Sequence, residues 1–132
     1  MNKKYDEYKF IYVARFDKLK RHDRLIKLFQ EKYSNLNYTM TCIGEGPEIN
    51  KIKNLTKKYN LTKFKFPGLI DRSKLDEFYL KSHAILFPAE IESFGLAILE
   101  SLEFNIPLFF WNEPPIKISN LFHISDLDYF LA

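Results

Sequence analysis

Short apolar runs alternate with helix-like segments along most of this chain, and that alternation limits the fold more than any other feature of the sequence. Runs typical of strands occupy residues 10–14, 38–43, 64–66, 84–87 and 107–110, with a weaker one at 121–124. Apolar spacing predicts helices that begin near Asp23, near Ile49, at Asp71 or Ser73, and within 92–100, with no clear closing helix after 124. Strands joined by crossover helices form a parallel sheet that is covered on both faces. We therefore predict a doubly wound, Rossmann-like α/β/α fold with a mainly parallel sheet of five to six strands.

The composition describes a single domain, residues 1–132, and gives no sign of its partner. Hydrophobic residues make up 46% of the chain, enough to bury a core. The formal net charge of +3, from 20 basic and 17 acidic residues, is too small to indicate a nucleic acid or a membrane. Cys42 has no second cysteine to pair with, which excludes an intrachain disulfide and favours a cytoplasmic setting. The sequence contains neither an apolar run long enough to span a membrane nor a signal-peptide pattern at residues 1–7.

The glycines and two cations follow the predicted strands. Four glycines come after the second, third and fourth strands: Gly44, Gly46, Gly68 and Gly95. Arg15 and Lys20 come after the first. The carboxyl ends of parallel strands meet at one edge of the sheet, and ligands of such folds bind beyond that edge. We therefore expect these residues to gather around one ligand, with Gly44 and Gly68 letting the backbone approach a flat base.

The stretch from Glu92 to Glu100 marks the junction between the fourth strand and a helix. The free N–H groups of the first helical turn, near Phe94, Gly95 and Leu96, favour an anion. Glu92 and Glu100 would lie about 12 Å apart if both are helical, whereas the carboxyl groups of an acid/base pair lie roughly 5 to 9 Å apart. This spacing suits a ligand with a negative middle and hydroxylated ends.

Together these residues fit a nucleoside diphosphate that carries a sugar. Arg15 and Lys20 supply cations for a diphosphate, and residues 94–96 supply N–H donors. Glu92 and Glu100 supply acceptors for hydroxyl groups, as the acidic residue of dinucleotide sites does for a ribose.

A set of motifs in fixed order extends from about residue 10 to residue 110: Val13-Ala14-Arg15, Lys20, Asp23-Arg24-Leu25-Ile26, Gly44-Glu45-Gly46-Pro47-Glu48, Phe66-Pro67-Gly68, Phe87-Pro88, and Glu92-Ser93-Phe94-Gly95 through Glu100. This set resembles the C-terminal, donor-binding domain of GT-B fold glycosyltransferases of family 4 (glycosyl transferases group 1). The resemblance implies one half of a GT-B fold, with the acceptor-binding N-terminal domain absent from this chain. It also implies transfer of a sugar from a nucleoside-diphosphate sugar to a glycan, lipid or small-molecule acceptor.

Carried over to this sequence, the resemblance implies that Glu92 meets the donor sugar and Glu100 the ribose hydroxyls. Arg15 and Lys20 would hold the diphosphate, and the amides of residues 94–96 would help to bind sugar and phosphate. These cations and amides can stabilise the negative charge of the leaving diphosphate without a metal. The resemblance further implies retention of configuration, a UDP or GDP sugar, a role in glycan biosynthesis, and peripheral membrane association of the full-length enzyme. The isolated domain is expected to be inactive.

Four positions depart from the family's pattern, because other residues replace glycine there: Ala14, Arg21, Ser93 and Asn105. Ala14 adds only a methyl group, and asparagine tolerates the left-handed conformation, so the fold is not threatened. Arg21 is interpreted as surface charge rather than as a phosphate contact.

No metal site and no cofactor other than the donor are predicted. His22, His83 and His123 lie on different predicted elements without ligand spacing, and the acidic pair in 126–128 is interpreted as a chance match to a metal motif. Two alternative functions stay open: a non-catalytic or regulatory module that binds nucleotide sugars, and a basic domain that presents the lysine-rich helix after Pro47 to nucleic acid. The lysines of that helix are interpreted as a solvated face, so no nucleic-acid partner is predicted.

Overall fold

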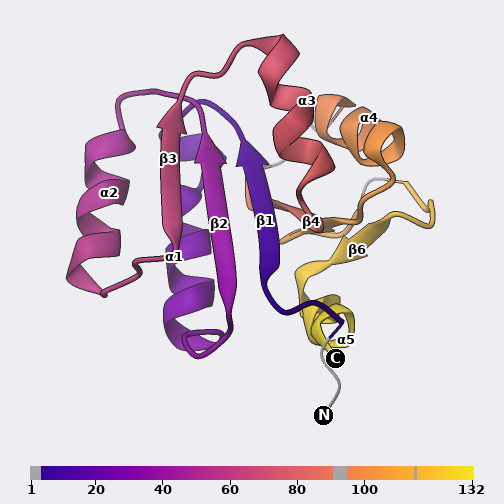
Figure 1. The fold of residues 1–132 in the computed structure, drawn as a ribbon, viewed down its shortest axis with the longest axis horizontal. Coiled ribbons are helices and arrows are strands. Elements are labelled where there is room, and N and C mark those ends of the chain that lie inside the picture. The colour runs from indigo at the N-terminus through magenta and orange to yellow at the C-terminus, as the bar shows by residue number, and fades with distance from the viewer. Residues whose placement is uncertain (1–3, 91–94, 115) are drawn as a thin grey trace.

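The computed structural model describes residues 4–90, 95–114 and 116–132, which form an open, six-stranded parallel sheet (Figure 1). The strands are β1 (Tyr8–Val13), β2 (Tyr38–Ile43), β3 (Phe64–Gly68), β4 (Ala84–Phe87), β5 (Leu108–Phe110) and β6 (Leu121–His123). Their order across the sheet is β3-β2-β1-β4-β5-β6, and each neighbouring pair is parallel. The predicted fold class is confirmed, and the carboxyl ends of the strands share one edge.

Helices connect the strands. They are α1 (His22–Glu31), α2 (Ile49–Lys58), α3 (Arg72–Leu80), α4 (Gly95–Phe104) and α5 (Leu127–Leu131), with short 3₁₀ turns η1 (Lys18–Lys20) and η2 (Ile124–Asp126). Right-handed crossovers place α1 and α2 on one face of the sheet and α3 and α4 on the other. Figure 1 shows α1 behind β2 and β3, and α4 contacts β4 and β5. This winding leaves the edge at the carboxyl ends of the strands open.

The core follows from the position of each strand in the sheet. The inner strands β4 and β5 are buried at every residue, as expected for strands covered on both faces. The edge strand β3 instead alternates, with Phe64 buried and Lys65 exposed. Phe29 of α1 packs on β2 and β3. Its ring stacks on Tyr38 and meets Phe64 edge-on, with ring centroids 4.1 and 5.6 Å apart. The aromatic residues therefore build much of the core.

The end of the chain differs from the prediction, because α5 is a helix where no clear closing helix was expected. It has five residues, too few for helical periodicity to show in the sequence. Its stability comes from distant contacts. Leu127 is fully buried, and Asp128 accepts a hydrogen bond from the Tyr33 hydroxyl at 2.6 Å and pairs with Lys32 at 2.9 Å. Asp128 is thus engaged in holding α5 against α1.

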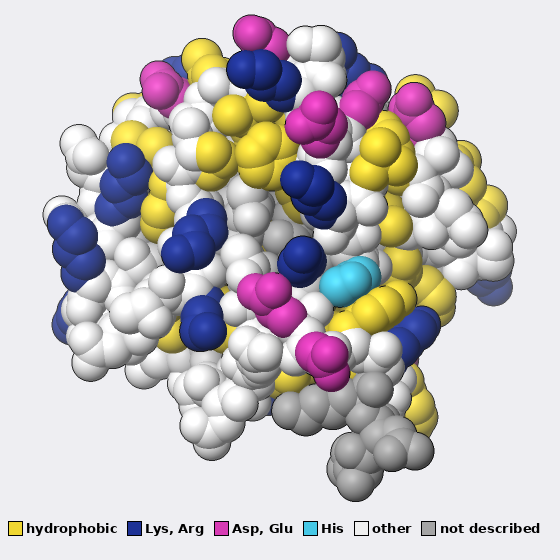
Figure 2. Space-filling model, in the orientation of Figure 1, with side chains coloured by type: hydrophobic (Ala, Val, Ile, Leu, Met, Phe, Trp, Pro, Cys, Tyr) yellow, Lys and Arg dark blue, Asp and Glu magenta, His cyan; other side chains and the backbone are white. Residues whose placement is uncertain are grey.

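Within the described residues, no helix is long and apolar enough to cross a membrane. In the same part of the chain, no group of three or more His, Cys, Asp or Glu residues is placed to hold a metal ion. On the face seen in Figure 2, basic side chains are spread out with acidic side chains among them.

Candidate functional site

The ends of β1, β2 and β3 surround a cavity of about 660 Å³, which we call the carboxyl-edge cavity. Its wall is formed by residues 13–15 at the end of β1, 43–47 at the end of β2, 69–70 after β3, and Leu75 in α3. Small-molecule sites in proteins have volumes of about 300 to 1,000 Å³. The cavity therefore has the size and the place in the fold that a ligand site requires.

Backbone hydrogen bonds continue beyond the strands and order the wall of this cavity. The Ala14 N–H donates to the Ile43 carbonyl at 3.0 Å, and the Phe16 N–H donates to the Glu45 carbonyl at 3.0 Å. The Gly44 N–H donates to the Gly68 carbonyl at 2.9 Å. The three loops are thus joined in the same order as the strands from which they emerge.

Gly44 is required by the fold itself. Its φ of 132° lies in a region that favours glycine, and a Cβ there would lie 2.2 Å from the Ala14 carbonyl oxygen. Gly68 also has a positive φ, of 84°, but a Cβ at this position would meet only the Glu45 carboxylate at 3.5 Å. Gly44 thus lets the backbone after β2 approach the backbone after β1 at Ala14. The space beside Gly68 is largely open.

The structure separates the two predicted phosphate cations. Arg15 is exposed and forms part of the cavity wall, whereas Lys20 lies in η1 and does not line that wall. The Asp17 carboxylate caps η1 by accepting from the Lys20 N–H at 3.1 Å, and the Lys20 carbonyl accepts from the Tyr12 hydroxyl at 2.9 Å. No carboxylate in the described residues pairs with the Arg15 or the Lys20 side chain. No carboxylate in the described part of the chain therefore neutralises either cation.

Arg21 forms ion pairs within the protein. It adopts the left-handed conformation, with φ 53° and ψ 44°, where the family's pattern has glycine. Its guanidinium contacts Asp23 at 3.0 Å and Glu90 at 2.9 Å, and these carboxylates raise its pKa. Glu90 also pairs with Arg24 at 3.3 Å. This network ties the start of α1 to the segment after β4.

Glu100 is buried in α4, with 6% of its surface exposed. Its Oε1 accepts from the Arg72 guanidinium of α3 at 3.3 Å, while its Oε2 is buried without a hydrogen-bond partner among the described residues. Burial raises the pKa of Glu100, and the nearby Arg72 opposes that rise. A carboxylate with one free oxygen is suited to accept hydroxyl hydrogen bonds.

The rest of the 92–100 stretch is described in part. Glu92, Ser93 and Phe94 lie outside the described residues, so their predicted roles stay predictions. Gly95 and Leu96 are exposed at the start of α4, and a Cβ on Gly95 would meet no atom of the described residues within 4 Å. The described part of the protein therefore does not crowd this helix start.

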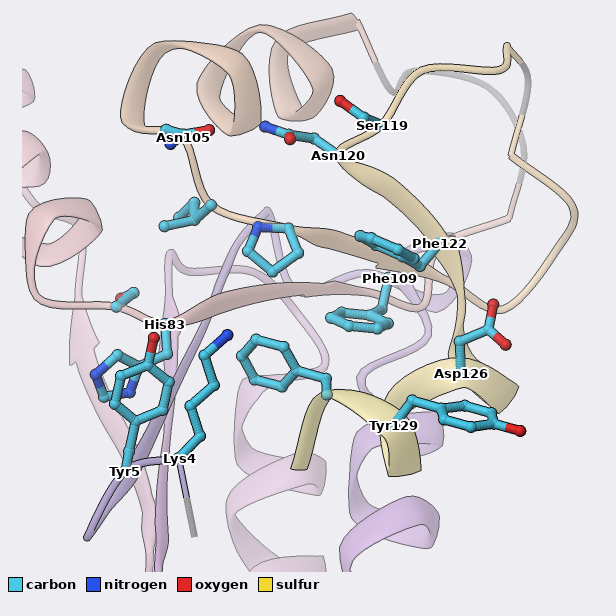
Figure 3. Close-up of a pocket in the computed structure, with 14 residues that line it drawn as sticks. Lys4, Tyr5, His83, Asn105, Phe109, Ser119, Asn120, Phe122, Asp126 and Tyr129 are labelled. Carbon is cyan, nitrogen blue, oxygen red and sulfur yellow. The ribbon is translucent and has the colours of Figure 1, made fainter. Parts of the chain in front are cut away.

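A second cavity, of about 630 Å³, lies at the amino ends of β4, β5 and β6, and we call it the amino-edge cavity. Figure 3 shows Asn105, Ser119 and Asn120 along one side of it and Phe109 and Phe122 between its walls. These two rings stack on each other at 5.3 Å. None of the residues predicted for the site lines this cavity.

The predictions from sequence overlooked the residues that surround Glu100 and Arg21. Arg72 and Tyr79 face Glu100 from α3, and Glu90 binds two arginines that are far from it in the chain. The sequence carries no signal for these pairs, because each joins residues from different elements.

Comparison with known proteins agrees with this geometry. Residues 1–118 match the family described as Glycosyl transferases group 1. The chain belongs to this family. It is 29% identical over 98 residues to the N-acetyl-alpha-D-glucosaminyl L-malate synthase of Bacillus anthracis, which covers 74% of the chain. It spans about a quarter of the length of the curated relatives that it matches.

Solved structures place the fold of this glycosyltransferase domain among the GT-B enzymes. The catalytic domain of cholesterol-alpha-glucosyltransferase from Helicobacter pylori is 25% identical, with a TM-score of 0.78 over 94% of this chain and 86% of that chain. The pneumococcal O-GlcNAc transferase GtfA, solved in complex with UDP and GlcNAc, is 23% identical, with a TM-score of 0.72 over 81% of this chain and 21% of that chain. The Rossmann-like domain predicted from the sequence is therefore a GT-B glycosyltransferase domain.

Proposed function

We propose that the carboxyl-edge cavity binds the nucleoside diphosphate of a sugar donor, and that the domain serves sugar transfer to an acceptor. One observation carries the proposal: the Arg15 guanidinium, unpaired within the described residues, shares a cavity with the apolar residues 69–70 and Leu75. An apolar wall suits a base, and a free guanidinium suits a phosphate. The complex of GtfA with UDP and GlcNAc supports this ligand class.

The roles of the other residues follow from their places around this edge. Lys20 and the N-terminus of α4, with Gly95 and Leu96, would stabilise negative charge that develops on the departing diphosphate. Gly44 allows the close approach of backbone in the cavity wall, Gly68 leaves open space at the end of β3, and Glu100 would accept the ribose hydroxyls. These groups can meet the charge without a metal, and the resemblance to family 4 implies a retaining transfer. The single cysteine, Cys42, favours a cytoplasmic setting.

Transfer itself is expected to require more polypeptide than this chain supplies. The curated relatives are about three times as long as this chain, because the 98 or 99 matched residues make up only about a quarter of each relative. The family resemblance implies that the acceptor site lies on another domain. We therefore expect the chain alone to bind the donor without transferring its sugar. A binding module without transfer has the same cavity and is the second candidate function.

Calorimetric titration with UDP, GDP and ADP tests the proposal and identifies the base. We expect saturable binding of one nucleotide, weakened about tenfold or more in Arg15→Ala and in Glu100→Ala, because each loses a charge-assisted contact. Lys57→Ala, which removes an exposed cation from α2, is the matched control and should bind as the wild type does. The absence of binding by all three nucleotides would overturn the function, and unchanged affinity in both variants would overturn the site.

A further inference from the structure

Glu100 is the one carboxylate buried among the described residues. A buried charge is strongly unfavourable unless a partner compensates for it. The partner here is Arg72, whose Nη1 lies 3.3 Å from Glu100 Oε1, and within the described residues only that oxygen has a hydrogen-bond partner. Within the described part of the chain, the contact therefore holds one oxygen of the carboxylate and leaves the other, Oε2, buried without a partner.

Arg72 is placed to connect the nucleotide cavity with Glu100. It is the first residue of α3, directly after the loop whose residues 69–70 line the carboxyl-edge cavity, and its side chain is 64% exposed. Its guanidinium therefore faces solvent on one side and a buried carboxylate on the other. An arginine with a purely structural role in the core would not be so exposed.

Other charged groups around Glu100 come from two helices. Tyr79 of α3 also faces the carboxylate and, like Arg72, lowers its pKa, whereas burial and the neighbouring Glu103 of α4 raise it. The negative charge of Glu100 in turn raises the pKa of Tyr79, which burial raises more strongly. Arg72 is the only cation in this group, so it has the largest part in keeping the carboxylate ionised.

We propose that Arg72 is a positioning residue, which holds Glu100 by Oε1 so that Oε2 is left to accept the ribose hydroxyls of the bound nucleotide. This inference rests on the proposed function and adds to it the residue that sets the geometry of the ribose contact. Arg72 acts through Glu100 and makes no contact of its own with the diphosphate. Its contribution should therefore exist only when both Glu100 and the ribose hydroxyls are present.

The test compares a ribonucleotide with its 2′,3′-dideoxy analogue. The nucleoside diphosphate that binds the wild type, and the analogue, are titrated into wild type, Arg72→Ala, Arg72→Gln, Glu100→Gln and the double variant Arg72→Ala/Glu100→Gln. We expect Arg72→Ala to weaken the ribonucleotide about tenfold and the analogue less than about twofold. In the Glu100→Gln background, Arg72→Ala should have no further effect. Lys74→Ala, an exposed cation on the same helix, is the control and should bind as the wild type does.

The pH profile adds a readout that a merely structural arginine would not change. Ribonucleotide binding should weaken as the pH falls through the pKa of Glu100, because a protonated carboxyl loses an acceptor. Without Arg72 that pKa rises, so the loss should begin at a higher pH in both Arg72→Ala and Arg72→Gln. Thermal melting shows whether the variants are folded, and Arg72→Gln, which retains much of the side chain, provides the test if Arg72→Ala is not.

The outcomes separate this inference from the proposed function. Equal weakening of the ribonucleotide and the analogue would mean that Arg72 contacts the phosphates, and unchanged affinity would mean that the ion pair has no role in binding. Either result overturns the inference while the nucleotide site stands. Failure of the wild type to bind any nucleotide would overturn both.

Discussion

The two cavities of this domain are nearly equal in size, at about 660 and 630 Å³, but they differ in chemistry. The carboxyl-edge cavity is lined by glycines, by apolar side chains such as Leu69 and Leu75, and by Arg15, which forms no ion pair within the described part of the chain. The amino-edge cavity is lined by aromatic rings that already pack on one another, such as Phe109 and Phe122, and by the charged residues Lys4 and Asp126. Volume alone would not choose between them. The first cavity lies beyond the carboxyl ends of parallel strands, where ligands of such folds bind, and this position points to it as the ligand site.

The largest expected effect concerns the backbone of the carboxyl edge. Gly44→Ala should destabilise the domain by about 3 kcal/mol or more, because its Cβ would overlap the Ala14 carbonyl and its φ is strained for alanine. Gly95→Ala is the matched substitution in open space and should be neutral or stabilise by up to about 1 kcal/mol. Urea unfolding monitored by circular dichroism measures both. Similar effects for the two glycines would contradict the close approach at Gly44.

His22 lies near the carboxyl edge and gives that region a pH dependence. It is buried and stacked on Phe16 at 3.9 Å, and neither ring nitrogen has a hydrogen-bond partner among the described groups. Burial lowers the pKa of His22 to about 4, from an ordinary value of 6.5. The unfolded chain therefore takes up a proton below pH 6.5 that the folded domain does not accept until about pH 4.

Stability should consequently fall by about 3 kcal/mol between about pH 7 and about pH 4 on account of His22. His22→Phe keeps the stacked ring and removes the titrating group, so that part of the pH dependence should disappear. Unfolding free energies of both proteins, measured across this range, give the contribution of His22 by difference. Parallel pH profiles for the two proteins would show that His22 is not held in its neutral form.

A third pair of variants tests the division of roles between the cavities. Phe122→Ala at the amino edge should cost about 2 kcal/mol of stability, because it removes a half-buried ring and the stacking partner of Phe109. It should leave nucleotide affinity unchanged. Arg15→Ala should do the reverse, with stability within about 0.5 kcal/mol of the wild type and affinity lowered about tenfold. Denaturation and calorimetry on the same samples measure both quantities. If Phe122→Ala lost nucleotide binding and Arg15→Ala did not, the ligand would lie in the amino-edge cavity and the proposed site would be wrong.

The smallest effect concerns the turn before β5, at the amino edge. Asn105 has a φ of 51°, a left-handed conformation that asparagine tolerates better than alanine does. Asn105→Ala should lower the free energy of unfolding by about 1 kcal/mol, whereas Asn105→Gly should change it by only about 0.3 kcal/mol. Thermal unfolding curves compare the two variants. Equal stability of the two would show that the conformation imposes no strain.

The fold could be predicted from the sequence where local patterns are strong. The strands at 38–43 and 84–87 appear with the predicted bounds, because apolar runs that end at glycine or proline set both their length and their ends. The helix α5 could not be predicted, since Leu127 and Asp128 hold it through contacts with distant elements. Local propensity does not encode such contacts.

For the candidate site, too, the sequence predicted residues at the ends of strands but not the contacts between different elements. Arg15, Gly44 and Gly68 could be chosen because parallel topology places the ends of their strands at one edge. The Arg72 contact to Glu100 spans 28 positions, and the Arg21 contact to Glu90 spans 69, so neither could be inferred from spacing within an element. The division of the cations, with Arg15 on the cavity wall and Lys20 away from it, likewise depends on how η1 folds back on the Tyr12 hydroxyl.

The hydrogen bond from the Gly44 N–H to the Gly68 carbonyl also bears on how fast and how tightly a ligand could bind. Since these loops are extensions of the sheet, their amides should exchange with solvent nearly as slowly as those of the strands. A nucleotide would then meet a wall that is already in its bound shape, with little conformational entropy left to lose. Association at this edge should accordingly be a single step whose rate rises linearly with nucleotide concentration and never reaches a plateau set by loop closure.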